Sequence, residues 1–242
     1  MKRIYVSFIS IIILLCASTR MYAQDTIYIP LKLRFGGDLV GPAFRIYDKN
    51  ILNVEGYFSY DQSERRALMI GAGYSNYKYS QDNYDYETNG MFARAGFDFN
   101  LLKPKKSSGI YWGGIGLHYG ISGYSYEVPS FTTENYWGTA TSSVPKKTSM
   151  AHFVEATPGV RAEIFRNLSI GWTISLRFML SSGAGSDLRP LYIPGFGNGS
   201  KNVSSSISYF ISWNIPYRTK RIIIQPEEEE EEEEVPVENT IP

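Results

Sequence analysis

The chain is poor in the residues that build metal centres and covalent cross-links. Its 242 residues include one cysteine and two histidines. The cysteine, Cys16, lies in the apolar leader, so a mature chain without the leader would have no thiol, disulfide or thiolate metal site. Two histidines with scattered carboxylates do not match a metal-site signature. We therefore predict neither a bound metal nor a cofactor.

Long apolar runs are also scarce beyond the N-terminus. After the leader, no stretch approaches the roughly 20 apolar residues that a membrane-spanning helix needs. The leader has a basic start at Lys2, an apolar stretch over residues 4–17 and a small residue at Ala23. This pattern is typical of a secretory signal peptide, so we predict that residues 1–23 are removed. The alternatives are an uncleaved membrane helix and a lipid anchor on Cys16, although Leu15 stands where a lipoprotein signal carries a small residue.

The formal net charge is zero, but its distribution is uneven. Residues 227–234 are all glutamate, and with Glu238 they hold nine of the 24 acidic residues. The body before them is net basic but contains no dense basic block, so we predict no nucleic-acid partner. Because consecutive glutamates repel one another, residues 219–242 are predicted to form a disordered acidic tail in the periplasm.

Between leader and tail, eight segments alternate apolar and polar residues with the period of a β-strand. The clearest covers residues 168–180, where Leu168, Trp172 and Phe178 share a face opposite Ser169 and Arg177. The eight predicted strands are residues 31–40, 51–60, 67–79, 91–101, 109–122, 150–164, 168–180 and 203–216. Aromatic residues are frequent among them, and strands of this kind cross a membrane in about 9–11 residues.

The connections alternate in length. The second, fourth and sixth strands are followed by short turns at residues 61–66, 102–108 and 166–167. Longer loops follow the other strands, at residues 41–50, 80–89, 123–149 and 181–202. Short periplasmic turns and longer outward loops are typical of outer-membrane barrels. We therefore predict an all-β fold, an eight-stranded antiparallel up-and-down transmembrane β-barrel over residues 24–218, integral to the outer membrane of a Gram-negative bacterium with both termini periplasmic.

Strand parity predicts which charged side chains face the lumen. An arginine or lysine at the lipid midplane would cost roughly 2–4 kcal/mol, whereas inside the barrel it can pair with an acid. The predicted lumen network consists of Lys32, Arg34, Asp38, Glu55, Arg94, Asp98, Glu155, Arg161, Glu163 and Arg177. A soluble lipocalin-type barrel would carry its apolar residues inside. The serine, glycine and balanced charges of the polar face favour a narrow interior filled by side chains over a solvated surface.

Several stretches resemble a known family, the uncharacterised outer-membrane β-barrel proteins of Bacteroidota, classed as a domain of unknown function. These stretches are residues 57–60, 71–79, 90–102, 188–195 and 208–217. The architecture is also similar to the eight-stranded barrels of the OmpA and OmpX type. The resemblance implies an outer-membrane location and carries no activity onto any residue.

The function predicted from the sequence is non-enzymatic, with no catalytic residue: a structural or surface-interaction role through the outward loops. The candidate loop-binding residues are Tyr124, Tyr126, Phe131, Tyr136, Trp137, Arg189 and Tyr192. Packing of these aromatics within the loops is the alternative. The expected partners are outer-membrane lipid, the barrel insertion machinery, and a surface ligand or envelope protein. Two other functions remain open: a lipid-modifying enzyme using His118 with Glu155 and Ser122, and a minor pore or subunit of an envelope complex.

Overall fold

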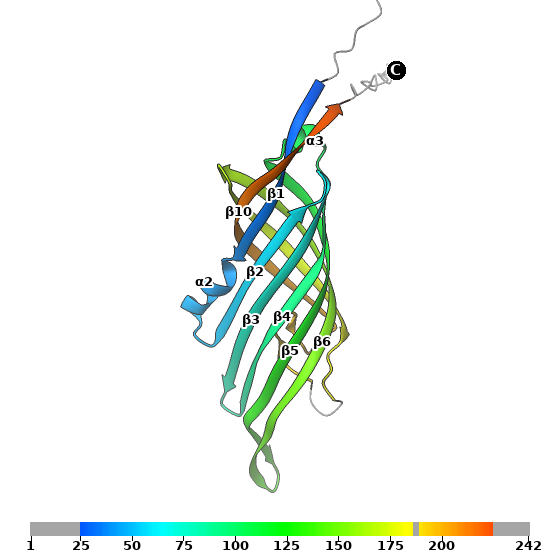
Figure 1. Ribbon diagram of the computed structural model, residues 1–242. Helices are drawn as coiled ribbons and strands as arrows, with labels where there is room; N and C mark the ends of the chain where they lie inside the picture. Colours follow the sequence, from blue (N-terminus) through cyan, green and yellow to red (C-terminus); the bar gives the residue numbers. More distant parts are fainter. Residues whose placement is uncertain (1–24, 186–188, 225–242) are drawn as a thin grey trace, which may run out of the picture. The chain divides into compact units, whose positions relative to one another are not determined.

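The protein is a closed antiparallel β-barrel. The computed structural model describes residues 25–185 and 189–224, and within them eight long strands form one ring in the order β1-β10-β7-β6-β5-β4-β3-β2 (Figure 1). Each strand of the ring lies beside the ring strand that follows it along the chain, and the first and last strands, β1 and β10, meet to close the ring. A small two-stranded sheet, β8-β9, lies between β7 and β10 in the sequence. The predicted all-β, eight-stranded, up-and-down barrel is confirmed.

The elements have the following bounds. The strands of the ring are β1 Asp25–Asp38, β2 Ile51–Asp61, β3 Arg66–Gln81, β4 Tyr84–Asn100, β5 Tyr111–Asn135, β6 Gly138–Phe165, β7 Leu168–Ser181 and β10 Val203–Ile224. The small sheet is formed by β8 Tyr192–Ile193 and β9 Gly197–Asn198, and the helices are α2 Val40–Tyr47 and α3 Pro104–Ser107. Among residues 25–185 and 189–224, neither helix is long and apolar enough to cross a lipid bilayer.

The two ends of the barrel differ, and each is named here by its connections. The turn end carries residues 62–65, residues 101–110 with α3, and residues 166–167. The hairpin end carries α2, the β3–β4 and β5–β6 hairpin tips and the connection from β7 to β10 (Figure 1). Three connections are two-residue turns, at residues 82–83, 136–137 and 166–167, and in the last of them Asn167 adopts a left-handed backbone with φ 69°. Asparagine is one of the few non-glycine residues that tolerates this conformation.

The barrel is apolar outside and polar inside, and β7 shows this most simply. Trp172 and Phe178 on its outer face are 41% and 46% exposed, whereas Ser175 and Arg177 on its inner face are 2% and 7% exposed. The same parity continues across the ladder to β10, where Ile207 pairs with Ile174. A soluble lipocalin-type barrel, with apolar residues inside, is therefore excluded for these strands.

Three strands, β4, β5 and β6, are much longer than the sequence predicted, and β3 is slightly longer. β3 and β4 continue to a turn at residues 82–83, and β5 and β6 continue to a turn at residues 136–137. Most residues of the predicted loops 80–89 and 123–149 therefore belong to strands, and those loop predictions were wrong. The cause is a reversal of polarity: beyond Ser122 the inner face of β5 becomes apolar, with Tyr124 and Tyr126 buried. The sequence pattern with apolar residues on the outer face stops where this reversal begins, and each strand was therefore predicted too short.

Two other predicted boundaries were also wrong. The first strand ends at Asp38 rather than residue 40, because the Asp38 carboxylate accepts a 2.8 Å hydrogen bond from the Gly41 backbone N–H and α2 begins. At the other end of the chain, β10 runs to Ile224, so residues 219–224 are strand and not disordered tail. The predicted signal peptide and the acidic part of the tail, from residue 225 on, lie outside the described residues.

Candidate functional site

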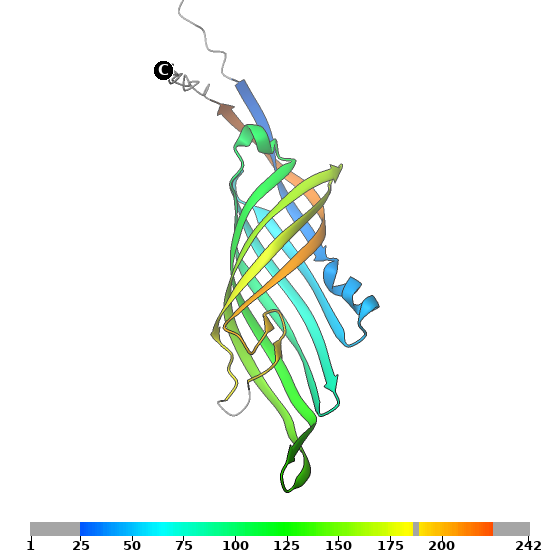
Figure 2. The same ribbon diagram turned by 180° about the vertical axis from the view of Figure 1, so that it is seen from behind.

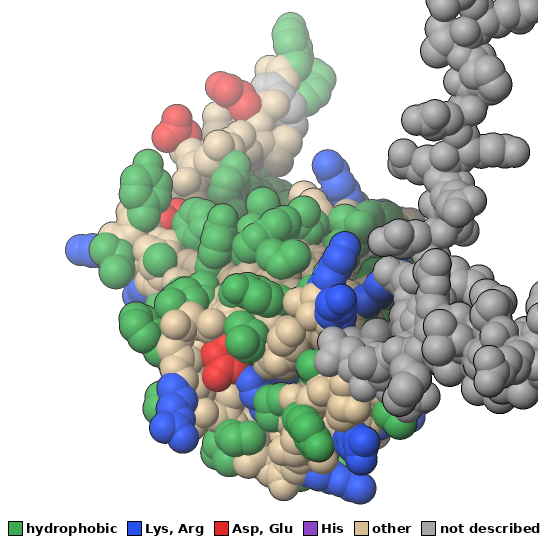
Figure 3. Space-filling model, turned by 90° about the horizontal axis from the view of Figure 1, so that it is seen from above, with side chains coloured by type: hydrophobic (Ala, Val, Ile, Leu, Met, Phe, Trp, Pro, Cys, Tyr) green, Lys and Arg blue, Asp and Glu red, His purple; other side chains and the backbone are tan. Residues whose placement is uncertain are grey.

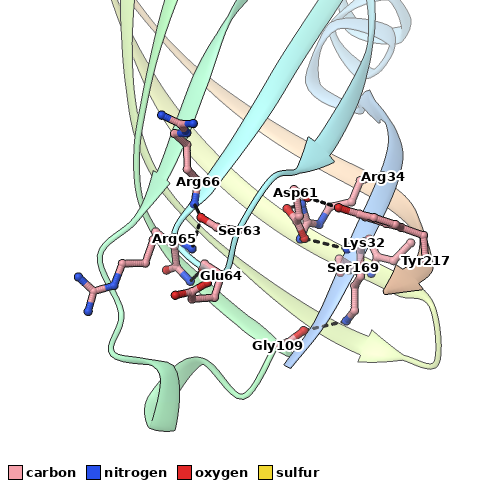
Figure 4. A network of polar contacts seen from close by, with 12 residues as sticks. Lys32, Arg34, Asp61, Ser63, Glu64, Arg65, Arg66, Gly109, Ser169 and Tyr217 are labelled. Carbon is pink, nitrogen blue, oxygen red and sulfur yellow. Dashed lines mark hydrogen bonds and ion pairs between the residues drawn. The ribbon is translucent and has the colours of Figure 1, made fainter. Parts of the chain in front are cut away.

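The lumen nearest the turn end is closed by two ion pairs. The Arg34 guanidinium donates to both carboxylate oxygens of Asp61 (Figure 4). The Lys32 ammonium donates to Glu163. Asp61 also accepts a 3.0 Å hydrogen bond from the Lys32 backbone N–H through its carboxylate, and its own carbonyl accepts one from the Tyr217 hydroxyl. Lys32 further donates to the Gly109 carbonyl at 2.7 Å. This layer thus joins β1, β2, β6, β10 and the connection before β5.

Asp61 was missing from the predicted network although the signal was in the sequence. The predicted second strand ended at Tyr60, which placed Asp61 in a turn. The alternation of inward residues along β2, from Glu55 through Tyr57 and Ser59, continues to Asp61, which is 8% exposed. Because parity persists to the end of a ladder, one further step would have identified it.

The middle of the lumen holds a guanidinium on an aromatic ring and a histidine beside a carboxylate. Arg161 lies over the Trp112 ring, 5.2 Å from the guanidinium carbon to the ring centroid. Nε2 of His118 lies 3.0 Å from the Asp98 carboxylate, which belongs to the neighbouring strand β4. Cavities of about 60 Å³ and 40 Å³ adjoin this layer, and Arg161 and Trp112 line both. Such volumes accommodate a few water molecules at most, so side chains fill the interior here.

The next layer toward the hairpin end is centred on Glu155. Arg94 donates to its two carboxylate oxygens at 2.7 and 2.6 Å, and Arg177 donates from Nε at 3.1 Å. Arg94 also pairs with Glu55 on β2. Glu155 is 2% exposed, and its carboxylate is shared by two buried arginines, Arg94 from β4 and Arg177 from β7. The structure places Asp38, the remaining member of the predicted network, at the start of α2, where it accepts the Gly41 N–H.

Beyond the charged layers, toward the hairpin end, lies an apolar cluster, here called the cap. Its buried members are Tyr86, Tyr124, Tyr126, Val128, Ala151, Phe153, Ile193 and Phe196. They come from β4, β5, β6 and the connection between β7 and β10, which folds against the inner face of the long hairpins (Figure 2). Tyr124 and Tyr126 are each 2% exposed, so their prediction as exposed binding residues was wrong. They were placed in a loop, whereas the parity of β5 directs them inward.

The cap is held by specific contacts as well as by apolar packing. The Tyr124 hydroxyl donates to the Ser182 carbonyl at 2.8 Å, and Tyr192 stacks on Tyr77 with ring centroids 4.8 Å apart. The Phe92 ring packs against Gly195, whose φ of +74° and closeness to that ring leave no room for a side chain. Residues 189–199 are therefore fixed across the lumen, and Tyr192, another predicted binding residue, is half-buried.

The remaining predicted binding residues lie in three settings. Phe131 is half-buried and packs on the cap, while Arg189 is exposed beside the undescribed residues 186–188. Tyr136 and Trp137 form the tip of the β5–β6 hairpin and are 93% and 90% exposed. Their rings contact each other edge to face at 5.3 Å. The tip is thus the part of the predicted surface that presents aromatic rings to solvent.

The structure does not bring His118, Glu155 and Ser122 together as the hypothesis of a lipid-modifying enzyme requires. His118 and Ser122 are four residues apart on β5, which separates them by about 13 Å along the strand. The second ring nitrogen of His118 faces Glu155 at 3.9 Å, and among the described residues no hydroxyl or thiol hydrogen bonds to His118. In the same part of the chain, no group of three or more His, Cys, Asp and Glu side chains could hold a metal ion. The other histidine, His152, accepts or donates a 2.7 Å hydrogen bond with the Tyr119 hydroxyl on the outer face.

Comparison with solved structures finds small bacterial barrels at low identity. Neisserial surface protein A is 11% identical with a TM-score of 0.35, covering 80% of this chain and all of that one. CarO of Acinetobacter baumannii is 12% identical with a TM-score of 0.35, covering 78% of this chain and 98% of its own. The attachment invasion locus protein Ail of Yersinia pestis is 9% identical with a TM-score of 0.32, covering 81% and 98%. No curated protein sequence matches the chain.

The sequence profile of one protein family matches residues 1–220, which is most of the chain. The chain therefore belongs to the family described as Domain of unknown function (DUF6048).

Proposed function

We propose that the protein is an integral outer-membrane barrel that does not conduct and that presents a rigid surface-binding hairpin to the cell exterior. The observation that carries this proposal is the arrangement of the two faces. Ion pairs and the cap fill the interior, while large apolar side chains such as Phe178, Leu180 and Ile207 stand 46–59% exposed on the outside. A water-exposed surface of that kind would be costly, whereas a bilayer accommodates it.

The turn end is proposed to face the periplasm. The longer excursions of the chain lie at the other end, where β5 and β6 run on to the turn at residues 136–137 and residues 182–202 join β7 to β10, and in outer-membrane barrels such excursions lie on the extracellular side. Figure 3, which views this end, shows Lys and Arg side chains around its rim. The exposed basic residues in or next to the turn end include Arg65, Arg66, Lys103, Lys105, Lys106, Arg166, Arg218 and Lys220. Basic side chains at a membrane rim pair favourably with lipid phosphates.

The surface contact is proposed at the tip of the β5–β6 hairpin, with a glycan as its ligand. The exposed rings of Tyr136 and Trp137 offer flat apolar faces for sugar C–H groups. Threonines 132, 133, 139 and 141 flank the tip and supply hydroxyl groups. Because the hairpin grows out of the cap, its base is ordered before any ligand binds, which lowers the entropic cost of binding.

The test is binding of the folded, full-length protein in detergent to an array of immobilised oligosaccharides. The double variant Tyr136→Ala/Trp137→Ala should lose most of the signal. Tyr47→Ala is the matched control, because Tyr47 on α2 is 92% exposed but lies away from the tip. No binding by the unmodified protein, or equal binding by the tip variant, would show that the hairpin is not a glycan-binding surface.

A second measurement tests the membrane-embedded, closed barrel independently. Cell fractionation should place the protein in the outer membrane, and the folded protein should migrate differently on a gel before and after boiling. In planar bilayers it should give little or no conductance, because its charged layers and cap fill the lumen. A soluble periplasmic protein, or a stable open channel, would contradict this part of the proposal.

A further inference from the structure

One wall of the barrel is shorter than its neighbours. β1 ends at Asp38, and the Leu39 backbone N–H donates to the Tyr209 carbonyl at 2.7 Å. Toward the hairpin end from that bond, β2 continues over residues 51–55 and β10 over residues 203–208 (Figure 2). In the described part of the chain these two stretches pair only with β3 and β7, respectively, and not with each other. The ring is thus interrupted by a seam about 17 Å long, at about 3.4 Å per residue.

A cavity of about 650 Å³ occupies this seam. Its outer lining includes Phe44 of α2 with Ile207 and Tyr209 of β10, which are 53%, 57% and 53% exposed. Its inner lining includes the polar residues Asp38, Arg177 and Ser206 beside the rings of Phe92 and Tyr192. The cavity therefore has an apolar mouth on the outer face of the barrel and a floor toward the lumen that carries both charged groups and aromatic rings. Its size is that of a small-molecule site.

In the described part of the chain, the seam leaves two strand edges without a neighbouring strand. Unpaired strand edges are costly in hydrocarbon, because lipid tails cannot hydrogen bond to backbone N–H and C=O groups. The mouth lies level with outward apolar residues such as Val203 and its ladder partner Phe178, so it faces the bilayer. A molecule that brings polar groups to the floor and leaves hydrocarbon at the mouth would satisfy both surroundings.

The charges on the floor narrow the chemistry of that molecule. One Asp38 carboxylate oxygen is buried and has no hydrogen-bond partner among the described residues, while the other accepts the Gly41 N–H. Arg177, which also lines the cavity, donates to Glu155 and to the Phe196 carbonyl and retains further N–H groups. An anionic acceptor and a cationic donor on one floor complement a head group that carries an ammonium and a phosphate.

We propose that the seam between β2 and β10 is a lateral binding site for a zwitterionic bilayer lipid of the phosphatidylethanolamine type. The ammonium group binds the free oxygen of Asp38, the phosphate binds Arg177, and the acyl chains lie against Phe44, Ile207 and Tyr209. The lipid reaches the site from the bilayer, because the mouth opens on the lipid-facing side. This site is separate from the hairpin tip and does not depend on it.

The test counts lipids retained by the full-length protein with native mass spectrometry. The folded protein in detergent is equilibrated with phosphatidylethanolamine or with phosphatidylglycerol, which lacks the ammonium group. We expect one retained phosphatidylethanolamine and weaker retention of phosphatidylglycerol. Asp38→Asn keeps an oxygen for the Gly41 N–H but removes the charge, and it should weaken phosphatidylethanolamine binding about tenfold, the equivalent of one charged hydrogen bond.

Two further variants make the result decisive. Asp48→Asn is the matched control, an acid at the other end of α2 that does not line the cavity, and it should bind as the unmodified protein does. Ser206→Phe fills the cavity and should abolish retention, while the gel shift on boiling confirms that each variant is folded. Equal retention of the two lipids, or unchanged binding by Asp38→Asn and Ser206→Phe, would overturn the proposal.

Discussion

The interior of this barrel is filled by charge along one part of its length and by aromatic rings along the other, although the same strands build both parts. On β5, the inward residue His118 meets carboxylates while its neighbour Leu117 is 52% exposed on the outside. Farther along the same strand, Tyr124 and Tyr126 point inward and are buried, and the polar Ser125 lies on the outer face. The comparison teaches that the polarity of the inner face follows the medium outside. In the proposed membrane placement, polar residues lie inside where the outer face meets hydrocarbon, and apolar residues lie inside where the outer face meets water.

The two parts should also respond differently to damage. In the charged layers, removal of one partner leaves a buried ion without compensation. In the cap, truncation of a ring leaves a void but no unpaired charge. The charged layers hold neighbouring walls of the ring together, whereas the cap also fixes a connection that could detach without opening the ring.

The largest effect is expected at the shared carboxylate of the charged part. Glu155→Gln should destabilise the folded protein by about 4 kcal/mol, because Arg177 loses its buried counter-charge and Arg94 is left with Glu55 alone. Urea unfolding in detergent, followed by tryptophan fluorescence, measures this loss. Glu87→Gln is the control, since Glu87 pairs with Lys78 in an exposed position, and it should cost less than about 1 kcal/mol. Equal losses in the two variants would mean that burial of the ion pairs does not matter.

A somewhat smaller effect is expected in the cap, with a different signature. Phe153→Ala should cost about 3 kcal/mol, because Phe153 is fully buried against Phe196 and over Gly120. Limited proteolysis should then cut residues 181–202 while the gel shift on boiling persists. The matched control is Phe165→Ala at the turn end, where the ring is 68% exposed. A protected connection in Phe153→Ala would show that the cap is not what fixes it.

A still smaller and pH-dependent effect is expected at the turn end. Burial acts to raise the pKa of Glu64, but the hydrogen bonds from Lys220 and from the backbone, together with the positive charges of Lys220 and Arg65, outweigh it and leave this pKa below its ordinary value. A lowered pKa in the folded state means that the pair stabilises the protein above the ordinary pKa and that this contribution disappears as the pH falls through the lowered value. Because Lys220 is largely exposed, the contribution should stay under about 1 kcal/mol.

Glu64→Gln tests this expectation. Unfolding of the variant and the unmodified protein should differ slightly at pH 7 and converge in acid. A difference that grows as the pH falls would contradict the assigned direction of the pKa shift.

The smallest effect on stability is expected at the hairpin tip. Tyr136→Ala/Trp137→Ala should leave the free energy of unfolding within about 0.5 kcal/mol of the unmodified protein, because both rings are almost fully exposed. The same denaturant titration measures it. A large loss would show that the tip packs on something in the folded protein, and it would weaken the case for a surface-binding role.

Much of the charged part was predictable from single residues. The alternation of side chains along each strand predicted that Lys32, Arg94 and Glu155 face the lumen. The structure places each of them in a lumen ion pair. The partners could not be predicted, because Arg94 meets Glu155 only through the registers of β4, β5 and β6. The cap was missed altogether, since its aromatics sit among Ser, Thr and Gly residues that are typical of loops.

The sequence by itself determined that residues 31–216 form alternating strands and which residues of those strands share a face, because the two-residue period of a strand is local. It also determined that the charged face of the predicted strands lies inside, since isolated charges in hydrocarbon are too costly. Only the tertiary structure decided how far β3 to β6 extend, that the connection at residues 189–199 fills the lumen, and where β1 stops short and leaves the seam. Those features depend on contacts between strands distant along the chain, and no local pattern records which of them will meet.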